Sequence, residues 1–271
     1  MLIQHILFAT FTLAAATGAA CAGTPVDTLI DTRSLSLSGA TAPVPPLYIT
    51  TESAAPSSMH DREGRVIGIA TDKVRAALER AGLPYTIDLL PWKRAYAAAR
   101  TRPDACVYST TRTPERNALF KWIGPIDSAE WVMMARAGSG IQLRTLEDAR
   151  RYRIGTYNGD ARDAYLRSRG FRVDAAPTDL TNPRKLLLGR IDLWAAALRT
   201  GTPVLEQNGW SERIVPVLVF NRIDVFLACN RAVPDAVVKR LNGAFASLER
   251  EGAMRRIERS YDNWNGQGGS R

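Results

Sequence analysis

Apolar and polar positions recur along this chain in two successive series of strand and helix patterns. In the first series, apolar residues spaced i, i+3, i+4 and i+7 predict a helix that Thr71 caps and Gly82 ends. Short apolar runs closed by proline or polar residues predict strands on either side of this helix. The other elements expected in this series are strands at 47–50, 85–90, 105–109 and 120–123 and a helix at 92–102.

The second series begins after residue 144. Thr145-Leu146-Glu147-Asp148 has the spacing of a helix-capping box, with Asp in the place of Glu or Gln. Asn182-Pro183 predicts another helix start, since proline suits the first helical position. The remaining elements expected here are strands at 152–156, 171–174 and 191–195, a helix at 160–169, two β-rich runs at 214–220 and 225–228, and a helical tail at 234–261.

Two successive series of this kind predict two α/β lobes. The last strand and the long tail helix have no partner in the second series, so we expect them to return to the first lobe. The first lobe is then discontinuous, with residues 47–127 plus 222–262, and the second lobe covers residues 128–221. Proteins of this architecture hold a ligand in the cleft between the lobes and close by a hinge.

The N-terminal segment has the pattern of a secretory signal peptide. The first 22 residues contain no Asp, Glu, Lys or Arg, and apolar residues at 6–16 precede Ala20-Cys21-Ala22, a small-x-small cleavage pattern. We therefore expect a signal peptide at 1–22 and export to the periplasm. We expect no lipid anchor at Cys21, because residues 18–20 lack the leucine of such sites. The alternative is a short buried or membrane-anchoring helix. A linker or mobile arm is expected at 23–46 and a flexible tail at 263–271.

The composition narrows the class of protein. Of the 271 residues, 45% are hydrophobic and 23% are charged, which is typical of a soluble globular protein with two lobes of ordinary size. Outside the N-terminus there is no run of about 18 uncharged apolar residues, so we expect no internal membrane span. The net charge of +9 is spread along the chain without a basic block, which argues against nucleic-acid binding and favours a solvated basic surface.

Export would leave Cys106 and Cys229 as the cysteines of the mature chain. In an oxidising compartment an even pair of cysteines suggests one disulfide. Two buried free thiols are an equal alternative on the residues alone.

The segment Ser109-Thr110-Thr111-Arg112-Thr113-Pro114-Glu115-Arg116 follows a predicted strand and carries the most chemistry. Thr113 suits the cap of a new helix and Pro114 suits its first position. The free backbone N–H groups of such a helix start, the guanidinium of Arg116 and the hydroxyl of Thr111 would together bind a carboxylate. The alternative, which the physics alone favours, is a capped turn with Arg116 in a surface ion pair.

This segment also carries a resemblance. A strand, then Ser-x-Thr-x-Thr-Pro-Glu-Arg, then Phe-Lys-Trp-x-Gly-Pro-Ile resembles the bacterial periplasmic solute-binding proteins of family 3, the polar amino-acid importer type with the type II periplasmic-binding fold. The resemblance spans about residues 47–262. Further matches are Gly64 to Gly68, Ile154-Gly155, Gly189-Arg190-Ile191-Asp192 and the tail Leu241-Asn242…Leu248…Gly252…Tyr261.

The resemblance implies an α/β fold with two lobes, each a mixed sheet flanked by helices, and a ligand cleft between them. It implies a periplasmic protein that captures a small polar solute bearing a carboxylate, such as an amino acid or a related compound. Capture would occur by hinge closure, and the partner would be the permease of an ABC importer. We expect a monomer with no metal and no cofactor.

The resemblance also assigns roles to residues of the cleft. Arg116 would hold the α-carboxylate of the solute, helped by Thr111 and by the backbone at Ser109. A turn of the second lobe that contains Tyr157 and Asp160 would close over the solute. The topology of the family sets the strand of Cys106 beside that of Cys229, which favours the disulfide.

At one position the chain departs from the family. Its amino-acid binders place an Asp five residues after the position of Asp192, where it holds the α-ammonium group, but this chain has Ala197 there. The departure argues against a standard α-amino acid as the ligand. Glu52, at the end of the first strand, is a replacement that would meet a cationic group, and an ordinary exposed loop carboxylate is the alternative. Trp92 and Arg94 are further candidates for the cleft, with packing at the helix end as the alternative for Trp92.

Catalysis has little support in the residues. His60 is the one histidine of the expected mature chain, and a solvated loop position accounts for it. Because no Gly-x-Ser-x-Gly elbow, P-loop or Cys/His metal spacing is present, we expect a binding protein and no enzyme. Two alternatives stay open. One is a carboxylic-acid dehydratase on the same fold, with Glu52 as its candidate acid, and the other is a sensor subunit that presents its ligand to a membrane receptor.

Overall fold

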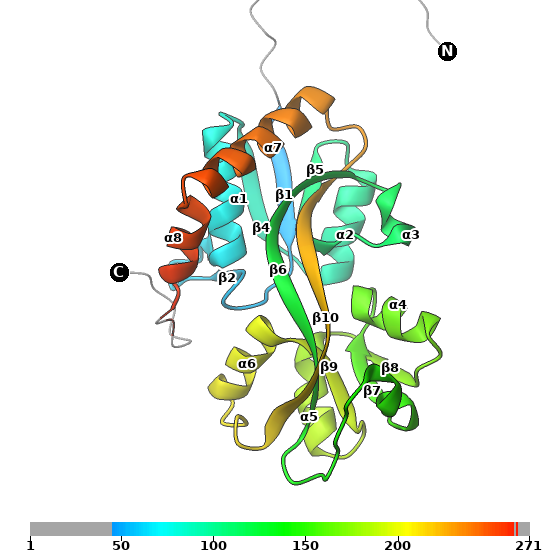
Figure 1. Cartoon of the computed structure of the whole chain (residues 1–271). Helices are drawn as coiled ribbons and strands as arrows, with labels where there is room; N and C mark the ends of the chain where they lie inside the picture. The colour runs from blue at the N-terminus through cyan, green and yellow to red at the C-terminus, as the bar shows by residue number, and fades with distance from the viewer. Residues whose placement is uncertain (1–44, 263, 265–271) are drawn as a thin grey trace, which may run out of the picture. The chain divides into compact units, whose positions relative to one another are not determined.

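The computed structural model of the chain describes residues 45–262 and 264, and it is built around one large sheet of eight strands (Figure 1). The predicted signal peptide, nearly all of the predicted arm and, apart from Trp264, the predicted tail lie outside the described residues. The sheet has the order β4-β1-β5-β10-β6-β9-β7-β8. Its strands are β1 (Leu47–Thr51), β4 (Tyr85–Leu89), β5 (Ala105–Thr111), β6 (Lys121–Arg136), β7 (Ile154–Tyr157), β8 (Val173–Ala176), β9 (Leu193–Ala197) and β10 (Ile214–Cys229).

Two long antiparallel strands, β6 and β10, run through both lobes and form a ribbon that joins them (Figure 1). In the first lobe β10 pairs antiparallel with β5, and β1 pairs parallel with β4 and β5. In the second lobe β6 pairs antiparallel with β9, and β7 pairs parallel with β8 and β9. Each lobe therefore holds a mixed part of the sheet, as expected.

The ribbon corrects the prediction of two separate runs at 214–220 and 225–228. Both runs belong to β10, and the register with β6 shifts at three places along it. These irregularities let the polar pair Asn221-Arg222 lie inside the strand, whereas an alternating pattern reads it as a break. The boundaries expected between the lobes, after 127 and before 222, both fall within the ribbon.

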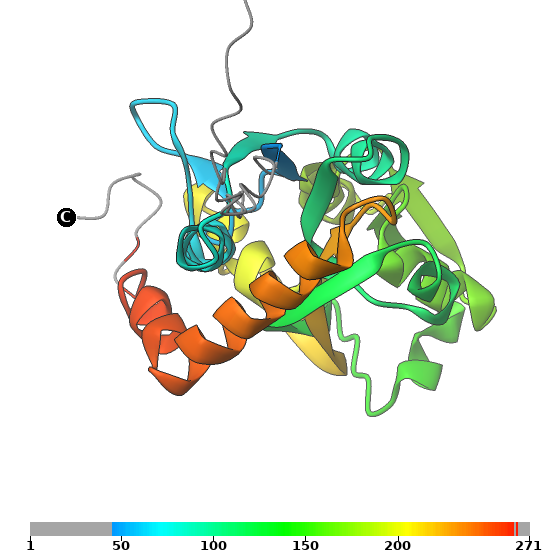
Figure 2. The same cartoon turned by 90° about the horizontal axis from the view of Figure 1, so that it is seen from above.

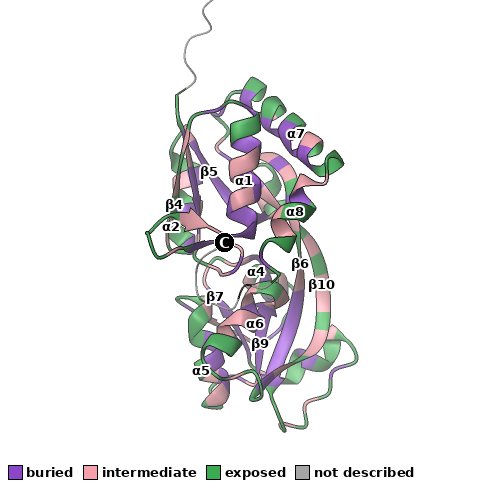
Figure 3. Cartoon of the chain, turned by 90° about the vertical axis from the view of Figure 1, so that its left-hand side faces the viewer, coloured by how far each residue is buried: buried purple, intermediate pink, exposed green. Residues whose placement is uncertain are grey.

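Helices cover the faces of the sheet in both lobes (Figures 1 and 3). The first lobe has α1 (Ile69–Arg80), α2 (Trp92–Thr101), α3 (Pro114–Asn117), α7 (Asp235–Arg250) and α8 (Ala253–Arg259). The second lobe has the single-turn helices η1 (Leu146–Arg151) and η2 (Asp179–Thr181) and the helices α4 (Ala161–Ser168), α5 (Asn182–Leu187) and α6 (Leu198–Gln207). A two-stranded hairpin pairs β2 (Met59–His60) with β3 (Val66–Ile67).

Two local predictions meet different outcomes, and one helix was not predicted. The capping box at Thr145 and Asp148 is present with both of its hydrogen bonds. Thr71 is not a cap, because α1 begins at Ile69 and the buried Thr71 hydroxyl lies 2.8 Å from the hydroxyl of Tyr108. The helix α6 was not expected, since Gly201 and Pro203 within it are residues that a sequence pattern treats as breakers.

The core of the first lobe lies between the sheet and α1, α7 and α8. The tail helix α7 packs on α1 and on β6 (Figure 2), and its apolar stripe is buried at Leu241, Phe245 and Leu248. Cys106 and Cys229 lie opposite each other on β5 and β10, with 3.9 Å between their Cα atoms, and form a disulfide. This bond ties the returning strand to the first lobe. In the second lobe, apolar side chains are buried on both faces of the sheet.

Candidate functional site

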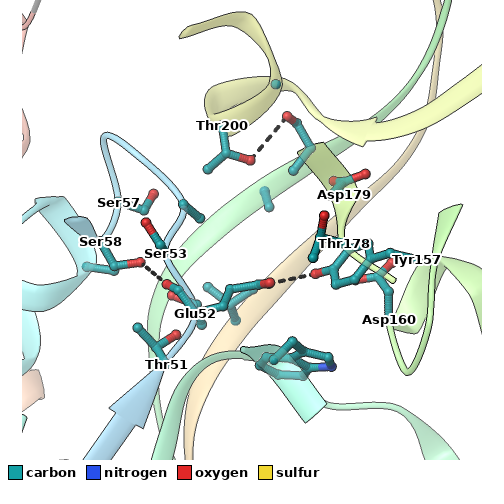
Figure 4. Close-up of a pocket in the computed structure, with 18 of the residues that line it drawn as sticks. Thr51, Glu52, Ser53, Ser57, Ser58, Tyr157, Asp160, Thr178, Asp179 and Thr200 are labelled. Carbon is teal, nitrogen blue, oxygen red and sulfur yellow. Dashed lines mark hydrogen bonds between the residues drawn. The ribbon is translucent and has the colours of Figure 1, made fainter. Parts of the chain in front are cut away.

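A cavity of about 570 Å³ lies between the two lobes, against the ribbon of β6 and β10 (Figure 4). We call it the interlobe cavity. Its polar wall in the first lobe follows the end of β1, and in the second lobe it follows the turn after β7 and the segment around η2. The polar residues at these walls are Thr51, Glu52, Ser53, Ser57, Ser58, Tyr157, Asn158, Asp160, Thr178 and Asp179.

Glu52 reaches into this cavity directly after β1 ends. The hydroxyl of Tyr157 donates a hydrogen bond of 2.6 Å to its Oε1 atom, and the Ser58 hydroxyl donates one of 2.7 Å to its backbone carbonyl (Figure 4). Burial raises the pKa of Glu52 to about 7. The hydrogen bond from Tyr157 opposes this rise, and the carboxylates of Asp160 and Asp179 add to it.

Arg162 is the buried cation of the second-lobe wall, and two carboxylates already neutralise it. Its guanidinium lies 2.7 Å from Asp160 Oδ1 and 3.2 Å from Asp179 Oδ2. It also donates a hydrogen bond of 3.2 Å to the backbone carbonyl of Ala195. Burial alone lowers the pKa of Arg162, but the two carboxylates outweigh it and raise the pKa well above its ordinary value. This cluster has one more negative charge than positive charge.

Asp179 is held in place from three directions. Besides Arg162, the indole N–H of Trp194 donates a hydrogen bond of 2.7 Å to its Oδ1, and the amide of Asn182 donates one of 3.0 Å. Burial raises the pKa of Asp179, while the charge of Arg162 and the bond from Trp194 oppose the rise. So many donors make the position of this carboxylate rigid.

A second ion cluster lies on the ribbon. Asp127 accepts a contact of 2.5 Å from Arg199 and one of 3.4 Å from the buried Lys73. Lys73 also lies 2.5 Å from Glu258. Arg199 faces the cavity, but its charge is already balanced by Asp127.

The charges that line the cavity therefore leave a negative excess. Glu52, Asp127, Asp160 and Asp179 face Lys93, Arg162 and Arg199, with Lys93 exposed at the start of α2. Arg162 and Arg199 are paired with aspartates, whereas Glu52 has tyrosine as its partner. A carboxylate of this kind can accept an ammonium or guanidinium group.

The profile of the bacterial extracellular solute-binding proteins, family 3, matches residues 47–265. This chain belongs to that family. A comparison with curated proteins finds no match. Within residues 45–262 and 264, no helix combines the length and the apolar content that crossing a membrane requires.

Solved structures share the two-lobed fold of this solute-binding protein. A histidine kinase sensor domain with similarity to periplasmic binding proteins is 19% identical, with a TM-score of 0.75 over 82% of this chain and 97% of that chain. The arginine-, lysine-, histidine-binding protein ArtJ from Geobacillus stearothermophilus is 17% identical, with a TM-score of 0.70 over 83% and 96%. The GluR0 ligand-binding core from Nostoc punctiforme, solved with L-glutamate, is 18% identical, with a TM-score of 0.68 over 81% and 99%. At these identities the likeness shows the fold alone.

Most of the residues singled out from the sequence of this solute-binding protein line the cavity. These are Glu52, Trp92, Ser109, Thr111, Tyr157 and Asp160. Ser109 has a φ of 56°, a left-handed backbone conformation that L-residues rarely adopt. Such strain gathers at functional sites, which agrees with the place of Ser109 on the cavity wall.

Arg116 lies between the lobes, as expected of a cleft residue, but at the edge of the site and in contact with the second lobe. Arg116 is not among the residues that line the cavity, because its guanidinium donates a hydrogen bond of 2.8 Å to the carbonyl of Gly159 in the second lobe. The guanidinium carbon also lies 5.8 Å and 5.2 Å from the ring centres of Trp92 and Tyr96. Thr113 makes no side-chain cap, and α3 has only four residues. Arg116 thus contacts the turn after β7 and not the cavity.

Arg94 is likewise outside the cavity and is exposed on α2. Residues two apart on a helix point to different sides, so Arg94 cannot share the direction of Trp92. Trp92 faces the cavity, and its indole N–H donates a hydrogen bond of 2.9 Å to the carbonyl of Gly159.

Several cavity residues escaped the sequence analysis. The charged ones are Lys93, Asp127, Arg162, Asp179 and Arg199. His60, expected as a solvated loop residue, is both exposed and at the cavity wall. Trp194 is buried in the core of the second lobe and also lines the cavity. The position of Asp179 between a predicted strand and a predicted helix was the one sequence signal for this set.

Proposed function

We propose that this chain is a periplasmic solute-binding protein that captures a small polar solute with a cationic group and delivers it to an ABC importer. Membership of family 3 supports solute binding, and the observation that carries the cationic group is Glu52. Its carboxylate faces the cavity with a tyrosine for its partner, while the nearby arginines are occupied by aspartates. A bound ammonium or guanidinium would supply the missing counter-charge.

A carboxylate on the same solute is a secondary feature of the proposal. Thr111 and Ser109 line the cavity and offer polar groups to it. Arg116 would have to leave the Gly159 carbonyl before it could bind that carboxylate. The cavity therefore supports a cationic group on the solute more strongly than it supports a carboxylate.

Closure of the lobes is the proposed mode of capture. The turn after β7 contacts the first lobe through Tyr157 and Gly159, which bind Glu52, Trp92 and Arg116. Tyr157 and Trp92 line the cavity, and residues of the β6–β10 ribbon, which joins the lobes, line it as well. Breaking the contacts while the ribbon bends would open the cavity, and re-forming them would enclose a solute.

The test is a thermal melting screen of the purified chain after unfolding and refolding, which strips bound solute. Amines, guanidines, amino acids and dicarboxylic acids are added in turn. A cation at about 100 times its dissociation constant adds roughly 2.7 kcal/mol and raises the melting temperature by about 5–10 °C for a chain of this size.

Three variants define the outcome. Glu52→Gln removes the charge with little change of shape, and we expect it to abolish the shift. Glu206→Gln changes an exposed glutamate of α6 in the same way, and we expect the shift to remain. A different result would contradict the proposal: melting-temperature shifts with dicarboxylic acids alone, which remain in Glu52→Gln and disappear in Arg116→Ala. Arg116 would then be the residue that binds the solute.

A further inference from the structure

The interlobe cavity is large for a compact polar solute. At about 570 Å³ it falls within the roughly 300–1,000 Å³ that proteins use for ligands of drug size. Its charged groups are few and sit mainly on the walls already described. Most of the remaining lining is apolar and comes from both lobes and from the ribbon.

The apolar lining comes from several elements of both lobes or from their ends. Its larger members include Trp92 on α2, Trp194 on β9, Leu89 and Leu90 at the end of β4, Trp131 on β6, Leu180 on η2, Val204 on α6 and Ile223 on β10. Trp131 is buried and packs edge-on against Tyr165, with 5.5 Å between ring centres, so its position is held from behind. A surface of this kind suits the apolar part of a ligand better than it suits water.

Leu180 is the most informative of these residues. Among the described residues, three large apolar side chains are strongly exposed, namely Leu180, Leu188 and Val219, and of these Leu180 alone lines the cavity. It is 60% exposed, although its neighbour Asp179 is held by Arg162, Trp194 and Asn182. Next to this anchored carboxylate, η2 presents an uncovered leucine to the cavity.

The end of β9 adds to the apolar wall. Ala197, which stands where amino-acid binders of the resembling type carry an Asp, lines the cavity together with Gly201 and Val204 of α6. A methyl group, a glycine and a valine offer no hydrogen bond from their side chains. The neighbouring Thr200 also lines the cavity, and its hydroxyl donates a hydrogen bond of 3.5 Å to the carbonyl of Ala197. None of these side chains carries the carboxylate that would balance the α-ammonium of an amino acid.

The polar groups gather around Glu52 instead. Figure 4 shows Thr51, Ser53, Ser57 and Ser58 on the Glu52 side, with Tyr157 reaching Glu52 from the opposite lobe. The cavity thus has a polar region around Glu52 at the end of β1, charged groups paired with one another on the second-lobe wall and the ribbon, and apolar surface between them.

We propose that the solute is an amphipathic cation, with an ammonium or guanidinium head that docks on Glu52 and an apolar body, about the size of an aromatic ring, that covers Leu180. This inference rests on the proposed function and names the class of solute. It excludes compact polar amino acids as the preferred ligands.

The test measures dissociation constants by calorimetry on the full chain with a matched set of probes. Tryptamine and 3-methylbutylamine carry both head and body, ethylamine carries the head alone, tryptophol carries the body with a hydroxyl in place of the ammonium, and L-arginine is a polar cation. We expect at least one of the two amphipathic amines to bind about tenfold or more tightly than ethylamine, tryptophol and L-arginine.

Two leucine variants locate the body. Leu180→Ser should weaken the amphipathic amine about fivefold or more and leave ethylamine unchanged, because only the apolar cover is lost. Leu188→Ser removes a leucine that is 65% exposed but lies outside the cavity lining. It should change the dissociation constant of neither the amphipathic amine nor ethylamine.

Each contrary result has a distinct meaning. If L-arginine or ethylamine binds as tightly as the amphipathic amines, or if the two leucine variants behave alike, the inference is overturned while the proposed function stands. If tryptophol equals tryptamine, the cationic head is overturned. If no cation of the set binds at all, the proposed function fails and the inference fails with it.

Discussion

Tyr157 of the second lobe donates a hydrogen bond of 2.6 Å to the carboxylate of Glu52 in the first lobe, 105 positions away in the chain. Burial raises the pKa of Glu52 to about 7 and raises that of Tyr157 well above its ordinary value. Near neutral pH the Glu52 carboxyl is therefore divided between its protonated and ionised forms. The cationic solute proposed above would therefore compete with a proton for Glu52.

The first prediction concerns stability and pH. The pKa of Glu52 in the folded chain, about 7, lies above its ordinary value of 4.5, so the folded state binds a proton more tightly than the unfolded state. The resulting stabilisation is complete below pH 4.5 and is lost as the pH rises through 7. Because part of the side chain faces the cavity, we expect the loss to be roughly 1–2 kcal/mol, less than the full effect of the shift.

Urea unfolding at pH 5 and pH 8 measures this effect. The Glu52→Gln variant cannot titrate at this position. The difference between its free energy of unfolding and that of the unmodified chain should therefore shift in favour of the variant from pH 5 to pH 8. Glu206→Gln, at an exposed site, should follow the unmodified chain. An equal difference between Glu52→Gln and the unmodified chain at both pH values would refute the prediction.

The second prediction concerns the contacts that hold the lobes together. The carbonyl of Gly159 accepts hydrogen bonds from Trp92 at 2.9 Å and from Arg116 at 2.8 Å. Trp92→Phe keeps an aromatic ring but removes its donor, and we expect the lobes to spend more time apart. Small-angle scattering should then show a larger radius of gyration without ligand, and ligand binding should weaken severalfold.

Trp122→Phe is the matched control. The indole N–H of Trp122 donates an equal bond of 2.9 Å, but to the carbonyl of Asn117 within the first lobe. This variant should leave the radius of gyration unchanged. Equal expansion in both variants would show that loss of an indole donor, and not opening of the lobes, causes the change.

The third prediction concerns the disulfide between Cys106 and Cys229, which closes a loop of 123 residues. Replacing both cysteines with alanine should lower the free energy of unfolding by about 2–5 kcal/mol, because the unfolded chain gains freedom. A thermal melt with and without reductant checks it: the reductant should destabilise the unmodified chain and have no effect on the double variant. Identical melting of the unmodified chain in both conditions would count against a stabilising role.

The fourth prediction compares two glycines of opposite character. A Cβ at Gly155 in β7 would lie 2.4 Å from Ile191 Cδ1 and 2.8 Å from Asn182 Oδ1, so Gly155→Ala should cost about 1–3 kcal/mol. Gly243 is exposed on α7 with no atom near the added Cβ, so Gly243→Ala should stabilise by about 0.5–1 kcal/mol. Denaturant unfolding of both variants measures the pair, and two changes of the same sign would disprove the steric argument.

Much of the fold could be predicted because its signals are local. The apolar stripe of α7 and the capping box at Thr145 depend on residues within a few positions of each other. Prediction failed where distant residues decide the outcome. Thr71 faces Tyr108 in place of capping a helix, and the strand β10 continues through Asn221 because β6 pairs with it.

The site shows the same division. Glu52 could be placed at the end of the first strand, where the cleft begins, but its partner Tyr157 could not be derived from spacing. Arg116 was expected in the cleft from the resemblance, but its bond to the carbonyl of Gly159, 43 positions later, could not be read from the motif. Motifs indicate which groups are available, and contacts between lobes decide which of them remain free.

The sequence by itself determined the two α/β series, the family to which the chain is similar and the absence of the usual Asp at Ala197. Only the tertiary structure decided which charges cancel. Arg162 meets Asp160 and Asp179, and Arg199 meets Asp127, across turns and between elements. Electrostatic interaction depends on distance in space and not on distance along the chain, so the charge left for a ligand becomes visible only after folding.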